Sequence, residues 1–287
     1  MTIATGAVQA TNVRIYVCVV GQSRIARHKM LHLAPDGDAI TLIYPFWIVI
    51  RGNQVTAVDT GFGADVAATR GVQDFRDPSV LLGQLGLSGS DVDEVVVTHL
   101  HFDHFSGAVG RFPRAQFVIQ GADIDYFMRR GAVHPVAVIA DPEAGRDIAS
   151  LGAAGRLRVI DGDGHTEAAI LFRVGGHTPG SQIVVVRDTP TPVVLAGSAE
   201  SSARGVLGGV GCDRDASHLY CNAQSLTPTA LIHSYDEYQT GFTTITSLAA
   251  GGRWFPGHDP LMLQGLCEVG AGVWQLPEFF PGAVSQS

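Results

Sequence analysis

The sequence predicts a mixed α/β protein. Short apolar runs bounded by turn residues recur along the whole chain, and helical segments lie among them in both halves. Apolar residues make up 46% of the 287 residues and charged residues only 16%, so the chain can bury a substantial core. Because no linker or repeat interrupts the pattern, we expect residues 1–287 to form a single domain.

Nine segments are predicted to be strands, because each is rich in β-branched or other apolar residues and is bounded by turn residues. The turn Arg51-Gly52-Asn53-Gln54 is typical of a hairpin. The longest apolar run, residues 40–50, is about half a membrane span and is expected to form a pair of strands. The predicted strands are Val13–Val20, Phe46–Arg51, Gln54–Val58, Glu94–Val97, Gln116–Ile119, Leu157–Ile160, Ile170–Val174, Ile183–Val186 and Val193–Ala196.

Three helices are predicted, at Ser79–Leu85, Gly121–Arg129 and Tyr238–Ala250. We expect Asp236 to cap the last helix and the following glycine pair to end it.

Composition and charge exclude some classes of function. The net charge is −8 and the 19 Lys and Arg residues are scattered, whereas nucleic-acid binding needs clustered positive charge. The N-terminus lacks the basic start of a signal peptide, and the four cysteines form no CxxC pair. We therefore expect a reduced, cytoplasmic protein that binds neither nucleic acid nor membranes.

The densest group of metal-binding side chains lies directly after the predicted strand Glu94–Val97. It is the segment His99-Leu100-His101-Phe102-Asp103-His104. Side chains two positions apart in an extended chain point the same way, so His99 and His101 face one point, and Asp103 and His104 face a second. Imidazole and carboxylate together suit zinc, with iron or manganese as alternatives. The segment therefore predicts two neighbouring divalent cations.

Two further histidines lie in rigid turns at strand ends. His177 is part of Gly176-His177-Thr178-Pro179-Gly180, between two predicted strands, and His258 follows Pro256-Gly257. A lone histidine in a turn is usually a solvated surface residue. Two of them, each held by glycine and proline, favour metal ligands instead.

Together these motifs resemble the metallo-β-lactamase superfamily. They are His-x-His-x-Asp-His at 99–104, Gly-His-Thr-Pro-Gly-Ser at 176–181, Pro-Gly-His-Asp at 256–259 and Asp-Thr-Gly at 59–61. The similarity runs from about Tyr44 to Pro260. Motif order and flanks are most similar to the lactonase branch, which includes the acyl-homoserine lactonases and 4-pyridoxolactonase. The resemblance implies an αβ/βα sandwich of two mixed sheets, with helices on the outer faces and metals at one edge.

We expect one metal to be held by His99, His101 and His177, and the other by Asp103, His104 and His258. Three protein ligands and an open position mark a catalytic site rather than a structural one. A metal-bound hydroxide would attack a carbonyl, and Asp103 would orient it or carry a proton to the leaving group. The leading expectation is a metal-dependent hydrolase of a small-molecule lactone, ester or amide, most of all a lactone or related cyclic ester.

One ligand of the family is missing from its usual place. An aspartate normally follows a late strand and bridges both metals, but Val193–Ala196 is followed by Gly197 and Ser198. Ser198 is a poor zinc ligand and leaves hydroxide alone to join the metals. Alternatively, Asp215 supplies the carboxylate after an insertion at residues 198–214, or Glu200 reaches in from nearby. All three explanations stay open.

The segment that begins at Asp215 is similar to a lactonase segment whose tyrosine contacts the substrate carbonyl. That position is His218 here, and Tyr220 lies two residues further on. Either side chain could donate a hydrogen bond to a developing oxyanion. Asp59 is expected either to hold a ligand histidine or to cap its own turn.

Several other functions stay open at this point. They are a thioesterase of the glyoxalase II type, an amide hydrolase, a mononuclear iron dioxygenase, and a degenerate member that binds metal or ligand without turnover. Ser198 is the best support for the last of these. The sequence does not set the oligomeric state.

Overall fold

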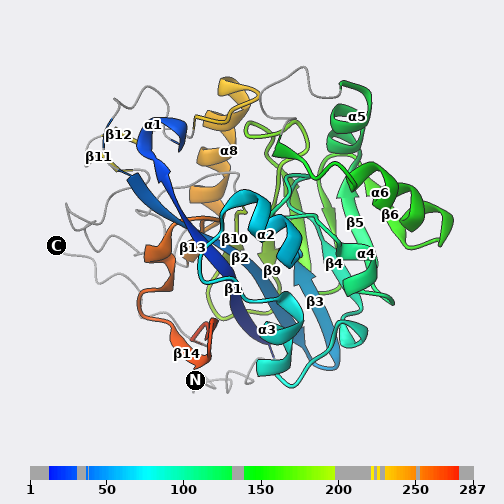
Figure 1. Ribbon diagram of the computed structural model, residues 1–287. Coiled ribbons are helices and arrows are strands. Elements are labelled where there is room, and N and C mark those ends of the chain that lie inside the picture. Colours follow the sequence, from blue (N-terminus) through cyan, green and yellow to red (C-terminus); the bar gives the residue numbers. More distant parts are fainter. Residues whose placement is uncertain are drawn as a thin grey trace, which may run out of the picture.

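The computed structural model describes residues 13–30, 37, 39–130, 139–197, 221–222, 225–226, 230–249 and 253–277. Within these residues the strands form two large sheets (Figure 1). The first has eight strands in the order β14-β15-β1-β2-β3-β4-β5-β6, and the second has five in the order β13-β10-β9-β8-β7. Both contain parallel and antiparallel neighbours, so the predicted pair of mixed sheets is confirmed.

Six strands of the first sheet were predicted, and β3 and β6 have the predicted bounds, whereas β14 and β15 were not predicted. The turn between β2 and β3 is the expected hairpin, with Arg51 opposite Gln54. The strands of this sheet are β1 (Val13–Ala26), β2 (Ala39–Arg51), β3 (Gln54–Val58), β4 (Glu94–Val96), β5 (Gln116–Gln120), β6 (Leu157–Ile160), β14 (Cys267–Gly270) and β15 (Val273–Gln275).

The second sheet packs against the first and includes two strands that sequence patterns did not predict, β7 and β13. Its strands are β7 (Gly164–His165), β8 (Ala169–Arg173), β9 (Gln182–Val186), β10 (Val193–Leu195) and β13 (Arg253–Phe255). A separate pair, β11 (Cys221–Asn222) and β12 (Ser225–Leu226), is also present.

The predicted strand pair at residues 40–50 is wrong, because β2 is one continuous strand there. The ladder between β1 and β2 shifts register between Val19 and Gln22, and Pro45 pairs with Val19 next to that shift. Proline has no N–H to donate, so it is tolerated at such an irregularity. Beyond the shift, β1 continues to Ala26, six residues past its predicted end.

The helices lie on the outer faces of the two sheets. The last helix, α8, begins at Tyr235 rather than Tyr238, because the Ser234 side chain accepts a hydrogen bond from the Glu237 N–H and caps it. The predicted cap, Asp236, is therefore wrong; it lies in the first turn. The helices are α1 (Arg27–Met30), α2 (Ala64–Arg70), α3 (Pro78–Gln84), α4 (Ala108–Arg111), α5 (Gly121–Arg130), α6 (Ala144–Ala153) and α8 (Tyr235–Leu248), with 3-10 turns η1 (Gly89–Asp91) and η4 (Pro260–Leu263). None of the helices in the described ranges is long and apolar enough to cross a membrane.

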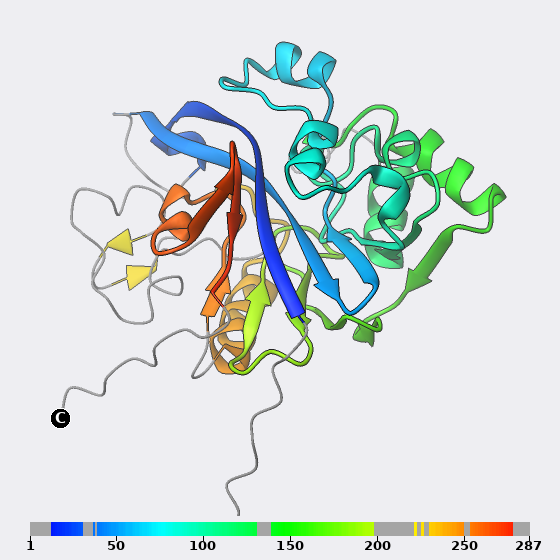
Figure 2. The same cartoon turned by 90° about the horizontal axis from the view of Figure 1, so that it is seen from below.

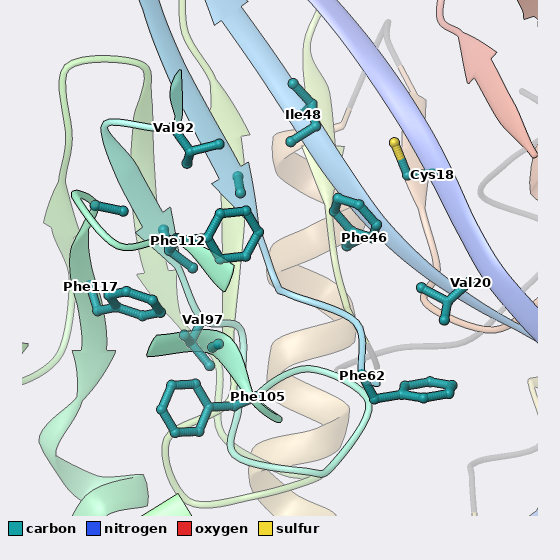
Figure 3. Packing of buried hydrophobic residues seen from close by; sticks show 14 of the residues in the cluster. Cys18, Val20, Phe46, Ile48, Phe62, Val92, Val97, Phe105, Phe112 and Phe117 are labelled. Atoms are coloured by element: carbon teal, nitrogen blue, oxygen red, sulfur yellow. The ribbon is translucent and has the colours of Figure 1, made fainter. Parts of the chain in front are cut away.

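Three buried apolar clusters hold the layers together. One joins helices α2 to α6 to the first sheet, and several of its aromatic side chains, including Phe46, Phe105 and Phe117, are shown in Figure 3. A second lies between the two sheets, and a third joins the second sheet to α8. The view in Figure 2 shows the same order of helices, sheet, sheet and α8. This is the αβ/βα sandwich that the resemblance implied.

Candidate metal centre

The six predicted metal ligands meet at one edge of the sandwich. The loop at residues 97–107 follows β4, the turn with His177 follows β8, and His258 follows β13. The carboxyl ends of strands from both sheets therefore supply the ligands, which is where sites gather in α/β proteins. All six side chains are buried. Their ligand atoms form two sets, each within 4.8 Å: His99 with His101 and His177, and Asp103 with His104 and His258.

The first set consists of three converging imidazoles. His99 Nε2 lies 2.9 Å from His101 Nδ1, and His177 Nε2 lies 3.1 Å from the same atom. His177 donates its one ring proton, on Nδ1, to the carbonyl of Leu231 at 2.6 Å. Its Nε2 therefore carries a lone pair that faces the other two rings. A neutral imidazole has one proton, so the three nitrogens cannot satisfy one another, and a shared cation would.

The second set is built around a carboxylate. Asp103 Oδ2 lies 3.2 Å from His104 Nε2 and 3.4 Å from His258 Nε2. His258 Nδ1 donates to the carbonyl of Ile43 at 2.9 Å, and His104 Nδ1 donates to Asp59 Oδ2 at 2.7 Å. In both histidines these bonds direct Nε2 to the shared point. Outer hydrogen bonds of this kind fix the tautomer of metal-binding histidines.

Asp59 belongs to this outer layer of the site. Besides His104, its carboxylate accepts hydrogen bonds from the Thr98 N–H at 2.7 Å and from the Thr98 hydroxyl at 2.9 Å. Its backbone has a left-handed φ of 65°, directly after β3. Of the two roles expected for Asp59, the structure shows contact with a predicted ligand histidine.

Burial and charge set the protonation of the site. Burial lowers the pKa of His99 well below 6.5 and that of His177 to about 4, so both rings are neutral near pH 7. For His104, burial also acts to lower the pKa, but the carboxylates of Asp103 and Asp59 outweigh it and raise the pKa to about 10. For Asp103, burial acts to raise the pKa, but the nearby imidazoles outweigh it and hold the pKa below its ordinary range. His99 and His177 are thus already in the neutral form that divalent metals bind, whereas His104 holds a proton near pH 7 that a cation would have to displace.

A model of the Metallo-beta-lactamase superfamily matches residues 41–220. The chain belongs to this superfamily.

Curated members of the superfamily are similar to part of the chain. An N-acyl homoserine lactonase AttM from Azorhizobium caulinodans is 30% identical over 129 residues, which are 40% of this chain and 49% of the relative. AttM from Rhizobium radiobacter is 29% identical over the same length. The chain thus matches about half the length of these curated relatives.

Solved structures share the fold over almost the whole chain. A quorum-quenching N-acyl homoserine lactone lactonase has a TM-score of 0.68 and 16% identity, over 90% of this chain and 96% of that one. The dizinc quorum-quenching lactonase AidC has a TM-score of 0.67 and 14% identity, over 96% and 97%. At these identities the likeness establishes the metallo-beta-lactamase fold alone.

Asp123 is a residue at the site that sequence reasoning did not select. It lies in the first turn of α5 and is fully buried. Its Oδ2 accepts hydrogen bonds from the Leu100 N–H and the Thr178 hydroxyl, each at 3.0 Å, and its Oδ1 accepts one from the Gly180 N–H at 2.5 Å. Burial raises the pKa of Asp123 to about 6. This one carboxylate therefore links the loop after β4 to the turn between β8 and β9.

A cavity of about 400 Å³ opens onto both ligand sets. His101, Asp103, His177 and His258 form part of its wall, and Tyr44 of β2 lies beside them. Its volume falls in the usual range for small-molecule sites.

Five residues with predicted roles lie outside the described residues: Ser198, Glu200, Asp215, His218 and Tyr220. The source of a bridging carboxylate and the residue that contacts the substrate carbonyl therefore stay predictions.

Proposed function

We propose that this protein is a metal-dependent hydrolase that opens a lactone or a related cyclic ester. The observation that carries the proposal is the pair of buried ligand sets at the wall of a small-molecule cavity. The substrate class is supported by the relatives, which are named N-acyl homoserine lactonases, and by neighbours in the solved structures that are named lactonases.

The two sets would each hold one divalent cation. His99, His101 and His177 offer three imidazole nitrogens, and Asp103, His104 and His258 offer two nitrogens and a carboxylate oxygen. Such donors suit zinc, and iron or manganese would also fit. When bound, the cations would supply an activated water and polarise the carbonyl.

Ring opening adds the oxygen of water to the carbonyl carbon, breaks the bond from that carbon to the ring oxygen, and needs a proton on the departing oxygen. Asp103 is the carboxylate in the cavity wall as far as the structure describes it. It would orient the water and pass the proton to the leaving oxygen. Thr98 and Asp59 would keep His104 in its ligating orientation through the hydrogen bonds given above.

A His101→Ala variant tests the proposal. We expect loss of bound zinc, because the substitution removes one of three ligands of the first set. Without the cation that activates water, lactone hydrolysis should fall at least about a hundredfold. The matched control is His165→Ala, which removes an exposed histidine on β7 and should keep zinc and activity. Circular dichroism checks that both variants fold.

Normal turnover by a metal-free His101→Ala protein would overturn the proposal. The same assay, extended to thioesters and amides, would identify a thioesterase or an amide hydrolase. Oxygen consumption with bound iron would identify a dioxygenase. If no substrate of any class were converted, the protein would be a member that binds metal or ligand without turnover.

A further inference from the structure

We infer that the substrate carries a negatively charged group, and that Arg70, together with Arg24, binds it beside the metal centre. This inference rests on the proposed hydrolase function and narrows its substrate class to a lactone or cyclic ester that bears a carboxylate on its side chain.

The cavity wall has two further parts besides the ligand sets. One part is apolar and includes Ile25, Met30, Leu42 and Ile139. The other is cationic and consists of the side chains of Arg24, on the extension of β1, and Arg70, the last residue of α2. A substrate in this cavity would therefore meet metal ligands, an apolar surface and two guanidinium groups.

Arg70 lines the same cavity as His101 and Asp103, and its side chain stacks on an aromatic ring there. Its guanidinium carbon lies 4.3 Å from the centre of the Phe102 ring, a stacking distance for a cation on an aromatic face. Phe102 stands in the chain between His101 and Asp103, one from each ligand set. The stacking therefore holds a positive charge in the wall of the cavity onto which both ligand sets open.

Other arginines of the chain form ion pairs that connect parts of the fold, whereas Arg24 and Arg70 form none with the described residues. Arg51 pairs with Asp188, and Arg173 pairs with Glu237. Within the described part of the chain, no carboxylate pairs with Arg24 or Arg70, and both side chains are exposed. A guanidinium that lines a cavity without a carboxylate partner is available to an anionic ligand, which it can bind through two parallel hydrogen bonds.

The charge balance of the cavity differs from that of the whole chain. The chain carries a net charge of −8, with 27 acidic and 19 basic residues. Among the described residues, the cavity wall has two arginines and one carboxylate, that of Asp103. Asp103 also belongs to a ligand set, where a bound cation would offset its charge. A positive cavity in an acidic protein attracts anions from solution and holds them in one orientation.

Paired lactones test the inference. The substrates are γ-lactones whose side chains end in a carboxylate after one, three or five carbons, each compared with its uncharged primary amide. For the zinc-loaded full chain, we expect kcat/KM to be about tenfold higher for the best carboxylate than for its amide, the size of one charge-assisted hydrogen bond. This ratio should fall as salt is added, because the arginines are exposed.

The variants are Arg70→Gln and Arg24→Gln, with Arg14→Gln as the matched control. Arg14 is an exposed arginine on the same strand as Arg24 and does not line this cavity. We expect the ratio of carboxylate to amide turnover to fall towards one in the Arg70 variant, to fall in part in the Arg24 variant, and to persist in the Arg14 variant.

Binding to the metal-free protein provides a readout that needs no turnover. Calorimetry should show that hexanoate binds more tightly than hexanamide, and that Arg70→Gln removes the difference. Equal turnover of carboxylate and amide, unchanged in Arg70→Gln, would overturn the inference and leave the hydrolase proposal standing. If no lactone is hydrolysed but the preference for hexanoate depends on Arg70, the anion site stands and the proposed function fails.

Discussion

Asp123 holds two ligand-bearing segments with a single carboxylate, and its replacement is our first prediction. Asparagine keeps the shape of the side chain but replaces one carboxylate oxygen with an amide N–H₂ group. That group would then face the N–H of Leu100 or of Gly180, so two hydrogen-bond donors would meet without an acceptor. We expect Asp123→Asn to weaken zinc binding about 10- to 100-fold, as seen when outer-layer partners are lost. Competition with a chromogenic chelator measures this affinity.

The matched control is Asp125→Asn, at an exposed position on the same helix. It should leave zinc affinity unchanged. Equal affinity in the two variants would show that Asp123 does not position the ligands.

Asp123 also gives a prediction about pH and stability. Burial raises its pKa from 3.8 to about 6 in the folded protein, so the folded state holds this proton more tightly than the unfolded state does. Its contribution to stability is therefore full below about pH 4 and is lost as the pH rises towards 6. In urea unfolding of metal-free protein, the stability of wild type relative to Asp123→Asn should fall over this window. A constant difference from pH 4 to 7 would contradict the raised pKa.

The six predicted ligands and Asp123 show what a sequence reveals about a site. Histidines in dense or rigid motifs, such as His99 and His177, are chemically distinctive, and the structure places them in the expected sets. Their role as ligands stays a prediction. Asp123 gave no comparable signal, because two of its partners are the backbone N–H groups of Leu100 and Gly180, and every residue except proline has such a group.

The end of β10 is coupled to the metal centre through Gly197. This glycine has a φ of 54°, and an added Cβ would lie 2.5 Å from the Thr98 hydroxyl, which binds Asp59. We expect Gly197→Ala to destabilise the protein by more than about 2 kcal/mol, since backbone strain and a steric clash add. Zinc affinity should fall as well, because Thr98 must move. Urea unfolding and chelator competition measure the two effects.

Gly155→Ala separates strain from clash. Gly155 has a similar φ of 66°, but an added Cβ meets nothing within 4 Å. Gly155→Ala should lower the free energy of unfolding by about 1 kcal/mol and leave zinc affinity unchanged. If both variants lost equal stability and kept their zinc, the contact with Thr98 would have no effect on the site.

Among the elements, strands with runs of valine or isoleucine were predicted better than short strands without such runs, such as β13, and better than the irregular half of β1. Runs of valine such as those in β4 and β9 are short and β-branched, which favours a strand covered on both faces over a helix. The far half of β1 includes Gln22, Ser23 and Arg24, and its pairing depends on a register shift that no local pattern shows. That half carries Arg24 to the cavity wall, so a part of the fold that lines the cavity was among the harder parts to predict.

In the molecule as a whole, each ligand set joins the two sheets. His99, His101, Asp103 and His104 follow β4 of the first sheet, whereas His177 follows β8 and His258 follows β13 of the second. A cation in either set would therefore tie the sheets at one edge, in addition to the apolar cluster between them. This arrangement predicts that metal binding and global stability are coupled.

Metal removal tests this coupling. A ligand present at one hundred times its dissociation constant stabilises the folded state by about 2.7 kcal/mol, which corresponds to about 4 to 5 °C in the melting temperature of a chain of this size. We expect chelation to lower the melting temperature by this much or more for wild type and for the exposed-site control His165→Ala. The change should be smaller in His177→Ala and in His258→Ala, because each has already lost the ligand that joins one set to the second sheet. If chelation removed all metal without changing the melting temperature, the apolar cluster alone would hold the sheets together, and the metal centre would be built on a fold that does not need it.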